Sequence, residues 1–366
     1  MSLKENGVHD TPDYGFGDGL WLAGADNDTH QPKSIEVATP EEIRSLSKEP
    51  YNPDHMSRVA EQMSNPRYVR SLGGLGVELA VIGNPDADEL KVIMYGWGGN
   101  FRNPNAVREA IALTYENPKV AYMFTNMPGT GNSEMLPGSA RKKMKKTGSY
   151  MPLGEYLGPV VDHVGQDYGN ITVNGHSLGG RVAMSTTGHM ARRVSEVNLI
   201  DPVGSRDMGA FALGHAFILR EGKELVRYEK SSLVLSAKEL GLSFLSQNNP
   251  ETIELIAGLS EEYAREFSRP KHGWRQQFLT DTLALSKAGF QVDLMIGAPN
   301  VQDKIRIFVP ELSHLNKWRD IARIAGMANY AAETPAKIET VVVVGHTHNV
   351  MNNPAALAKM YNVGDF

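Results

Sequence analysis

The stretch ITVNGHSLGGRVAM at residues 171–184 decides the fold of this 366-residue chain. Apolar, β-favouring residues lead into Gly-His-Ser-Leu-Gly, and a helical pattern follows at once. Gly175 and Gly179 stand two residues before and two residues after Ser177. A tight strand-to-helix turn strains its apex residue and exposes the apex side chain, so the flanking residues must be small. The sequence therefore predicts a turn that presents the hydroxyl of Ser177.

The helix that follows this turn would direct its first backbone amides toward the serine. The amide of Leu178 is then placed to hold an oxyanion that develops next to Ser177. A Gly-x-Ser-x-Gly sequence between a strand and a helix is the nucleophile-elbow pattern of serine hydrolases. The pattern indicates nucleophilic chemistry at Ser177.

Strand and helix patterns alternate on both sides of the turn. We expect strands within residues 76–97 (two of them), 119–129, 170–175, 194–202, 304–311 and 339–345, with helices between most of them. Strands that alternate with helices predict a parallel sheet with helices on both faces. The expected fold class is α/β.

Periodicity divides the chain into three parts. Residues 1–65 show little periodicity beyond a short helix expected at 39–47, and we expect an N-terminal extension there. Residues 66–203 and 301–366 carry the alternating pattern and form the expected core. Residues 204–300 have helical patterning without a convincing strand, which indicates a helical insertion that covers the core.

Composition excludes several classes of protein. The net charge of −5 gives no broad attraction to nucleic acid or to an anionic membrane. The absence of cysteine excludes disulfides, thiolate metal sites and a cysteine nucleophile. No apolar run reaches membrane-spanning length and the first residues lack signal-peptide character, so we expect a cytoplasmic protein. The basic run RKKMKK at 141–146 is expected to be a solvated loop, with an anion-docking patch as the alternative.

Three further segments, in order, support a resemblance to the α/β-hydrolase fold proteins: VIMYGWGGN at 92–100, FTNMPGTGNSE at 124–134 and VVVVGHTHNVMNNP at 341–354. The resemblance implies a mostly parallel central sheet flanked by helices, with a helical cap insertion. It also implies that the amide of Trp97 is the second oxyanion donor, although Tyr95 replaces the usual His before Gly96. Asn126 stands where the family usually has Asp.

The resemblance places the general base in the loop after the last strand, a few residues before a proline. Two histidines stand there: His348 lies six residues before Pro354, and His346 lies eight residues before it. We expect His348 to be the base, with His346 as the alternative. An imidazole can take the proton of a serine hydroxyl when a carboxylate orients its ring.

The acid departs from the family's usual pattern. The common position after the penultimate strand holds Ser313, and Glu311 is two residues early. Some relatives take the acid from the end of the strand that follows the elbow helix, where this chain has Asp201. We expect Asp201 to be the acid, with Glu311 as the alternative.

These residues predict a serine hydrolase that cleaves a carboxylic ester, with a hydrophobic acyl or aryl group, through an acyl-enzyme intermediate. We expect no cofactor and no metal; the expected partner is a small-molecule ester, and the oligomeric state is left open. One alternative is a non-catalytic protein of the same fold that binds a ligand or partner. A second is a metallophosphoesterase, because GHTH at 345–348 resembles that family's last metal-binding motif, with DTH at 28–30 as a weak match to the first.

Overall fold

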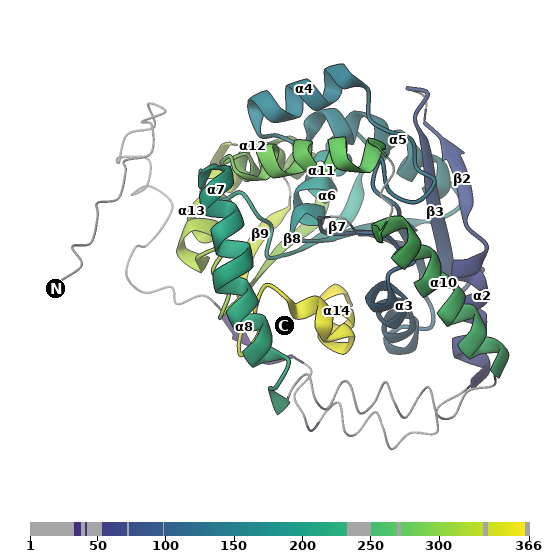
Figure 1. Cartoon of the computed structure of the whole chain (residues 1–366). Helices are drawn as coiled ribbons and strands as arrows, with labels where there is room; N and C mark the ends of the chain where they lie inside the picture. Colours follow the sequence, from purple (N-terminus) through teal and green to yellow (C-terminus); the bar gives the residue numbers. More distant parts are fainter. Residues whose placement is uncertain are drawn as a thin grey trace.

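The computed structural model describes residues 33–37, 41, 53–71, 73–97, 99–232, 250–268, 272–331 and 336–362. The helix expected at 39–47 lies outside the described residues apart from Glu41, and much of the expected N-terminal extension also does. The described part contains one central sheet with helices on both faces (Figure 1). The α/β fold class expected from the sequence is confirmed.

The sheet has nine strands among the described residues, in the spatial order β1-β9-β8-β7-β6-β4-β5-β3-β2. β3 pairs antiparallel with β2 and β5, and every other pair is parallel. The central strands β4 and β6 are buried along almost their whole length, as expected for strands covered on both faces. The bounds are β1 Lys33–Ile35, β2 Arg67–Arg70, β3 Gly76–Gly83, β4 Glu89–Met94, β5 Ala121–Thr125, β6 Asn170–His176, β7 Val194–Ile200, β8 Val301–Pro310 and β9 Lys337–Val343.

Helices cover the two faces of the sheet and divide the apolar core into two clusters. One face carries α2 (Pro53–Ser64), α3 (Pro104–Glu116) and α14 (Pro354–Tyr361). The other face carries α5 (Met151–Gly165), α6 (Leu178–Thr187), α12 (Phe290–Gly297) and α13 (Trp318–Ala331) (Figure 1). The sheet is thus held between two apolar layers, and its strand ends carry the loops.

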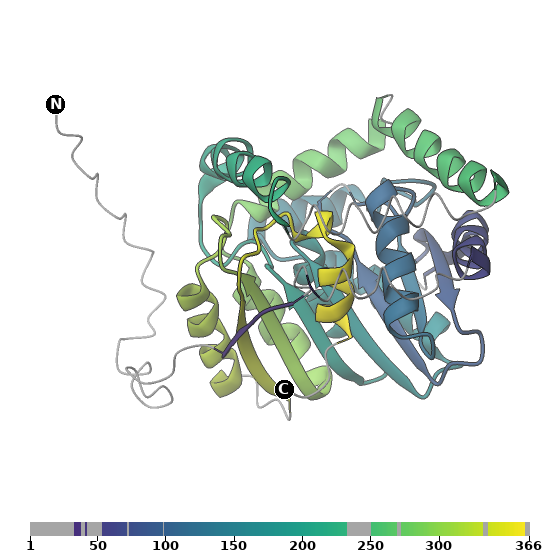
Figure 2. The ribbon, with the colours of Figure 1, turned by 90° about the horizontal axis from the view of Figure 1, so that it is seen from below.

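Between β7 and β8 the chain forms a series of helices that we call the inserted helices. They are α7 (Gly209–His215), the π-helix η2 (Ala216–Glu221), α8 (Gly222–Tyr228), α10 (Pro250–Ser268) and α11 (His272–Leu285). Figure 2 shows them over one end of the strands, at the top of the view. α12 and the 3-10 turn η3 (Ala298–Asn300) then lead into β8. The described residues of 204–300 contain no strand.

The basic run at 141–146 is not a loop. It lies in α4 (Gly138–Thr147), where Met144 and Ala140 are buried and the lysines lie mainly on the outer side. The helical spacing of these two apolar residues, rather than the surrounding charge, decided the local structure. No helix in the described part of the chain is both long enough and apolar enough to cross a membrane.

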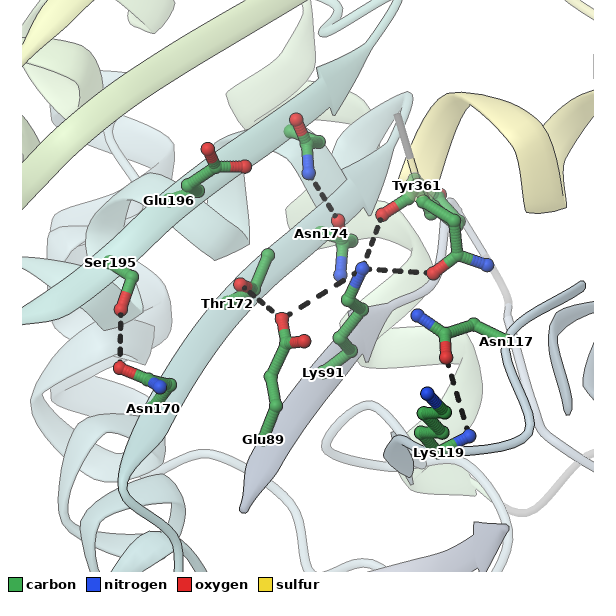
Figure 3. Close-up of polar contacts among 12 residues, drawn as sticks. Glu89, Lys91, Asn117, Lys119, Asn170, Thr172, Asn174, Ser195, Glu196 and Tyr361 are labelled. Carbon is green, nitrogen blue, oxygen red and sulfur yellow. Dashed lines mark hydrogen bonds and ion pairs between the residues drawn. The ribbon is translucent and has the colours of Figure 1, made fainter. Parts of the chain in front are cut away.

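A polar network anchors the C-terminal end of α14 to the sheet (Figure 3). The buried ammonium of Lys91 on β4 donates to the carbonyl of Tyr361 at 3.2 Å and to Oδ1 of Asn362 at 2.9 Å. Glu89 lies 3.8 Å from the same ammonium. Burial lowers the pKa of Lys91, so its few partners must compensate for lost water. This contact fixes the helix that follows the last loop of the chain.

We expect Lys91→Met to lower the free energy of unfolding by about 1–3 kcal/mol, because it leaves a buried carbonyl without its donor. Chemical denaturation measures the loss. The matched control is Lys119→Met, whose side chain is exposed. Equal stabilities of the two variants would contradict the anchoring role.

A second buried ionisable group on this face has no hydrogen bond to its side chain within the described part of the chain. Glu109 of α3 is 5% exposed, and burial raises its carboxyl pKa to about 8. The folded chain therefore keeps a proton on Glu109 that the unfolded chain, with a pKa of about 4.5, releases. Stability consequently falls as the pH rises from about 4.5 to about 8.

We expect Glu109→Gln to remove this dependence. The variant should gain about 3 kcal/mol of stability relative to wild type between pH 5 and pH 7.5, at about 1.4 kcal/mol for each pH unit. Unfolding curves across this range measure the gain. Glu116→Gln, at the exposed end of the same helix, is the control. Parallel curves for wild type and Glu109→Gln would contradict the buried-proton account.

Candidate active site

Ser177 occupies the turn between β6 and α6 with φ 57° and ψ −123°, a backbone conformation that non-glycine residues rarely adopt. Its amide donates to the carbonyl of Ile200 at 2.8 Å, which ties the turn to β7. The residue is only 3% exposed, so the expectation of an exposed side chain is wrong. The inserted helices lie at the end of the strands where this turn stands (Figure 2).

The two flanking glycines are required by backbone packing. A Cβ at Gly175 would lie 2.2 Å from the carbonyl oxygen of Gly179, and a Cβ at Gly179 would lie 2.0 Å from that of Met94. Both contacts are with backbone atoms that cannot move aside cheaply. The spacing in the sequence therefore reports how closely α6 approaches β6 and β4.

Asp201 follows β7 directly and also has a positive φ, of 45°. Its side chain is fully buried. Oδ2 accepts from Nδ1 of His348 at 2.7 Å and from the hydroxyl of Ser313 at 2.6 Å, and Oδ1 accepts from Nδ2 of Asn316 at 2.7 Å. The amide of Asp201 donates to the carbonyl of Phe308 on β8 at 2.8 Å. Three donors thus converge on one carboxyl group.

These donors keep the carboxyl ionised. Burial alone would raise the pKa of Asp201, but the hydrogen bond and charge of His348, with the bonds from Ser313 and Asn316, outweigh burial and lower it. An ionised carboxylate can only accept hydrogen bonds. Nδ1 of His348 must therefore carry the proton, which leaves its Nε2 unprotonated when the ring is neutral.

His348 is held from two sides. Besides the bond to Asp201, its backbone carbonyl accepts from Nε2 of His176 at 2.9 Å. Burial, with the nearby charge of His348, lowers the pKa of His176 to about 3, so that ring stays neutral. Within the described part of the chain, neither Nε2 of His348 nor the hydroxyl of Ser177 has a recorded hydrogen bond. Both groups remain available to a bound molecule.

The alternative base and acid lie elsewhere. The buried ring of His346 bonds through Nδ1 to the hydroxyl of Tyr228 at 2.7 Å and through Nε2 to the carbonyl of Val37 at 3.2 Å. Burial lowers its pKa. Glu311 accepts from the amide of Gly345 at 2.9 Å. Neither is recorded in contact with the Asp201–His348 pair.

The GHTH motif does not form a shared ligand position, because His346 and His348 bind different partners. Among the described residues, no three His, Cys, Asp or Glu side chains come together as a possible metal site. The DTH stretch at 28–30 lies outside the described residues.

The loop after β4 runs beside the serine. A Cβ on Gly96 would lie 3.4 Å from the Cβ of Ser177, so a larger residue would press on the turn. Trp97 follows, and its backbone amide has no recorded hydrogen bond to any described residue. Leu178 is the first residue of α6, where helix amides lack partners within the helix. Among the described residues, neither of these two amides has a hydrogen-bond partner, and the loop of Trp97 approaches the serine turn at Gly96.

The π-helix η2 brings an aromatic side chain to the base. The ring of Phe217 lies edge-on to His348, with centroids 5.4 Å apart, and 5.7 Å from the ring of Trp97. Four residues on, Glu221 is 2% exposed and accepts from the amide of His314. Burial raises the pKa of Glu221. The inserted helices therefore contribute to the surroundings of His348.

Sequence reasoning missed four of these contacts. The sequence gives no specific signal for the roles of His176, Asn316 or Phe217 in these contacts. Ser313 was noted only as the occupant of the usual acid position. That substitution was the available signal, since a hydroxyl in the vacant position can donate to a carboxylate that arrives from the neighbouring strand.

Comparison with known proteins gives the following matches. The sequence pattern of the alpha/beta hydrolase family matches residues 96–360. Similar solved structures include a membrane phospholipase A described as a novel bacterial virulence factor (14% identity, 88% of each chain, TM-score 0.50). An esterase from Exiguobacterium antarcticum aligns with 15% identity, 82% of this chain, 100% of that chain and TM-score 0.48. No curated protein matches the chain. At such identities the likeness to these structures concerns the fold alone.

We expect Ser313→Ala to lower the free energy of unfolding by about 1.5–3 kcal/mol at pH 7, the range for a hydrogen bond to a charged group. Because the pKa of Asp201 is lowered in the folded chain, this contribution is complete above the usual carboxyl pKa of 3.8. It should shrink as the pH falls from there through the lowered pKa of the folded carboxyl. Chemical denaturation at pH 7 and at the lowest pH at which wild type stays folded measures the change.

Ser139→Ala is the matched control, since Ser139 is exposed on α4. A loss for Ser313→Ala that is the same at both pH values would show that the hydroxyl does not act through the charge of Asp201.

Proposed function

Because this chain belongs to the alpha/beta hydrolase family, we propose that it is a serine hydrolase that cleaves carboxylic esters. The supporting observation is the 2.7 Å bond from His348 to the buried carboxylate of Asp201, beside a serine held at positive φ. An imidazole fixed in this tautomer is the base that a serine nucleophile needs.

In the first half of the reaction, Oγ of Ser177 attacks the carbonyl carbon of the ester. The hydroxyl proton passes to Nε2 of His348, and Asp201 stabilises the imidazolium that forms. The tetrahedral intermediate then collapses, the bond to the alcohol breaks, and the leaving oxygen takes the proton from Nε2. The acyl group stays on Ser177.

The backbone amides of Trp97 and Leu178 hold the negative oxygen of the intermediate. Both are positioned by the chain before the reaction begins, so they need no reorganisation as charge develops. A donor of this kind is worth about 10²–10³ in rate. The close packing of Gly96 against the serine turn supports this pairing of the two loops.

In the second half, water takes the place of the alcohol. His348 removes a proton from the water as it attacks the acyl carbon, and the same proton then returns to Oγ of Ser177. The carboxylic acid leaves, and the chain is restored. Every proton in both halves moves through Nε2 of His348.

The substrate is a small ester whose acyl or aryl part is largely apolar. The ring of Trp97 contacts that of Phe217, which also lies against His348, and it stacks on Phe278 with ring centroids 4.3 Å apart. Such rings favour contact with apolar groups through the large surface that they bury. Phe278 comes from α11, so the inserted helices would help to select the substrate.

Labelling by a fluorophosphonate probe tests the proposal. We expect wild type to label, Ser177→Ala not to label, and both His348→Gln and Asp201→Asn to label about 10³–10⁴-fold more slowly, as expected when the base or its orientation is lost.

His346→Gln and Glu311→Gln are the matched controls and should label at close to the wild-type rate. Circular dichroism establishes that each variant is folded. A folded wild type that does not label would reject the hydrolase and favour a non-catalytic binding protein. Loss of labelling in His346→Gln but not in His348→Gln would assign the role of general base to His346 instead of His348.

A further inference from the structure

A small pocket lies next to the serine turn, on the side of the two proposed oxyanion amides. Its lining includes Gly96, Trp97, Leu178, Gln277, Phe278 and Asp281. The last three come from α11 of the inserted helices. Thr130 also lines the pocket, but its hydroxyl donates to the carbonyl of Met127 at 2.7 Å. The rest of the wall is apolar or aromatic, so the two polar side chains from α11 need an explanation.

Two polar atoms of this pocket are buried without a partner. Within the described structure, Nε1 of Trp97 and Oε1 of Gln277 have no hydrogen bond. Gln277 as a whole is only 3% exposed. A buried donor or acceptor that stays unpaired costs stability, and in natural proteins such groups are usually satisfied by a ligand or by water. Both residues line this pocket.

The orientation of the Gln277 amide is set by its neighbour. Nε2 donates to Oδ1 of Asp281 at 3.0 Å, and the hydroxyl of Tyr150 reaches the same oxygen at 3.3 Å. With the amide nitrogen engaged, the oxygen of Gln277 remains as the acceptor. Burial raises the pKa of Asp281 to about 7, so this carboxyl is about half protonated at neutral pH.

The position of the pocket indicates whether it receives the acyl half or the alcohol half of the ester. The leaving alcohol must come within hydrogen-bond reach of Nε2 of His348 to take its proton. The pocket is lined by the residues of both oxyanion amides, whereas His348 is not part of its lining. The acyl half therefore extends toward the pocket, whose volume of about 10 Å³ accepts a single hydroxyl-sized group.

We propose that Gln277 and Trp97 select short acyl groups that carry a hydroxyl. The hydroxyl donates to Oε1 of Gln277 and accepts from Nε1–H of Trp97, so a single neutral group satisfies both orphan atoms. Asp281 acts as the positioning residue that fixes the Gln277 amide. This inference rests on the proposed ester hydrolysis at Ser177. It narrows the substrate from apolar esters in general to hydroxyacyl esters.

Isosteric substrates test the inference, because a hydroxyl and a methyl group have nearly the same size. The pair is 4-nitrophenyl 3-hydroxybutanoate and 4-nitrophenyl 3-methylbutanoate, with an identical leaving group. We expect wild type to favour the hydroxyacyl ester at least tenfold in kcat/KM, since a site built for a hydroxyl discriminates against the apolar analogue. The difference should appear mainly in KM.

Gln277→Met keeps the length of the side chain and removes the acceptor. We expect the preference to fall to within about threefold of unity. Asp281→Ala should reduce the preference in the same direction, because the amide is then free to turn. Gln291→Met, on α12 and outside the pocket lining, is the matched control and should keep the wild-type preference.

The outcomes separate the two proposals. If wild type labels but shows no preference between the two esters, or if Gln277→Met retains the preference, the hydroxyacyl inference is overturned and the hydrolase stands. A stronger preference for the 3-aminobutanoate ester, which carries an ammonium, would overturn it in favour of cation binding at Asp281. Failure of wild type to label rejects the underlying hydrolase itself.

Discussion

The carboxylate of Asp201 is the constraint on which the site depends. It is a fully buried charge that joins three strand ends. Asp201 follows β7, and its partners Ser313 and Asn316 follow β8 and His348 follows β9. An unpaired charge in such a place would cost several kcal/mol. The loops must therefore close around it in one arrangement, and that arrangement also fixes the tautomer of His348. Stability and chemistry share the same hydrogen bonds at this point.

The opposite ends of the strands are organised by a different kind of contact. Lys91 holds the end of α14 through a backbone carbonyl and a side-chain amide, without a catalytic group nearby. α14 follows the loop that carries His348, so the loop is fixed at β9 on one side and by this anchor on the other. His176 adds a third attachment, because it bonds the backbone of His348 from the serine turn itself. Polar contacts at both ends of the strands thus hold the loop that carries His348 in place.

Much of this could be predicted from local sequence. The glycines around Ser177 indicate a close approach of two backbone segments, and the alternating apolar patterns predict a parallel sheet. The fold expected from these patterns is confirmed. The predictions that Asp201 and His348 serve the serine remain predictions about role, although the two lie in contact. Local sequence could not choose between His346 and His348 on physical grounds, because the choice depends on partners far along the chain. The loop predicted for the basic run at 141–146 is wrong, because the prediction rested on the charge of the run and not on the two apolar residues at helical spacing.

The distances along the chain between Asp201 and its partners have a kinetic consequence. Ser313 is 112 residues away, Asn316 is 115 and His348 is 147, and the inserted helices account for most of the separation. Closing loops of this length costs chain entropy before any contact repays it, and long-range contacts slow folding. Until these contacts form, burial of the unpaired carboxylate is unfavourable, so it stays hydrated. We therefore expect the site to assemble after the sheet, as one of the last events on the folding pathway, and to be the first part lost when the chain begins to unfold.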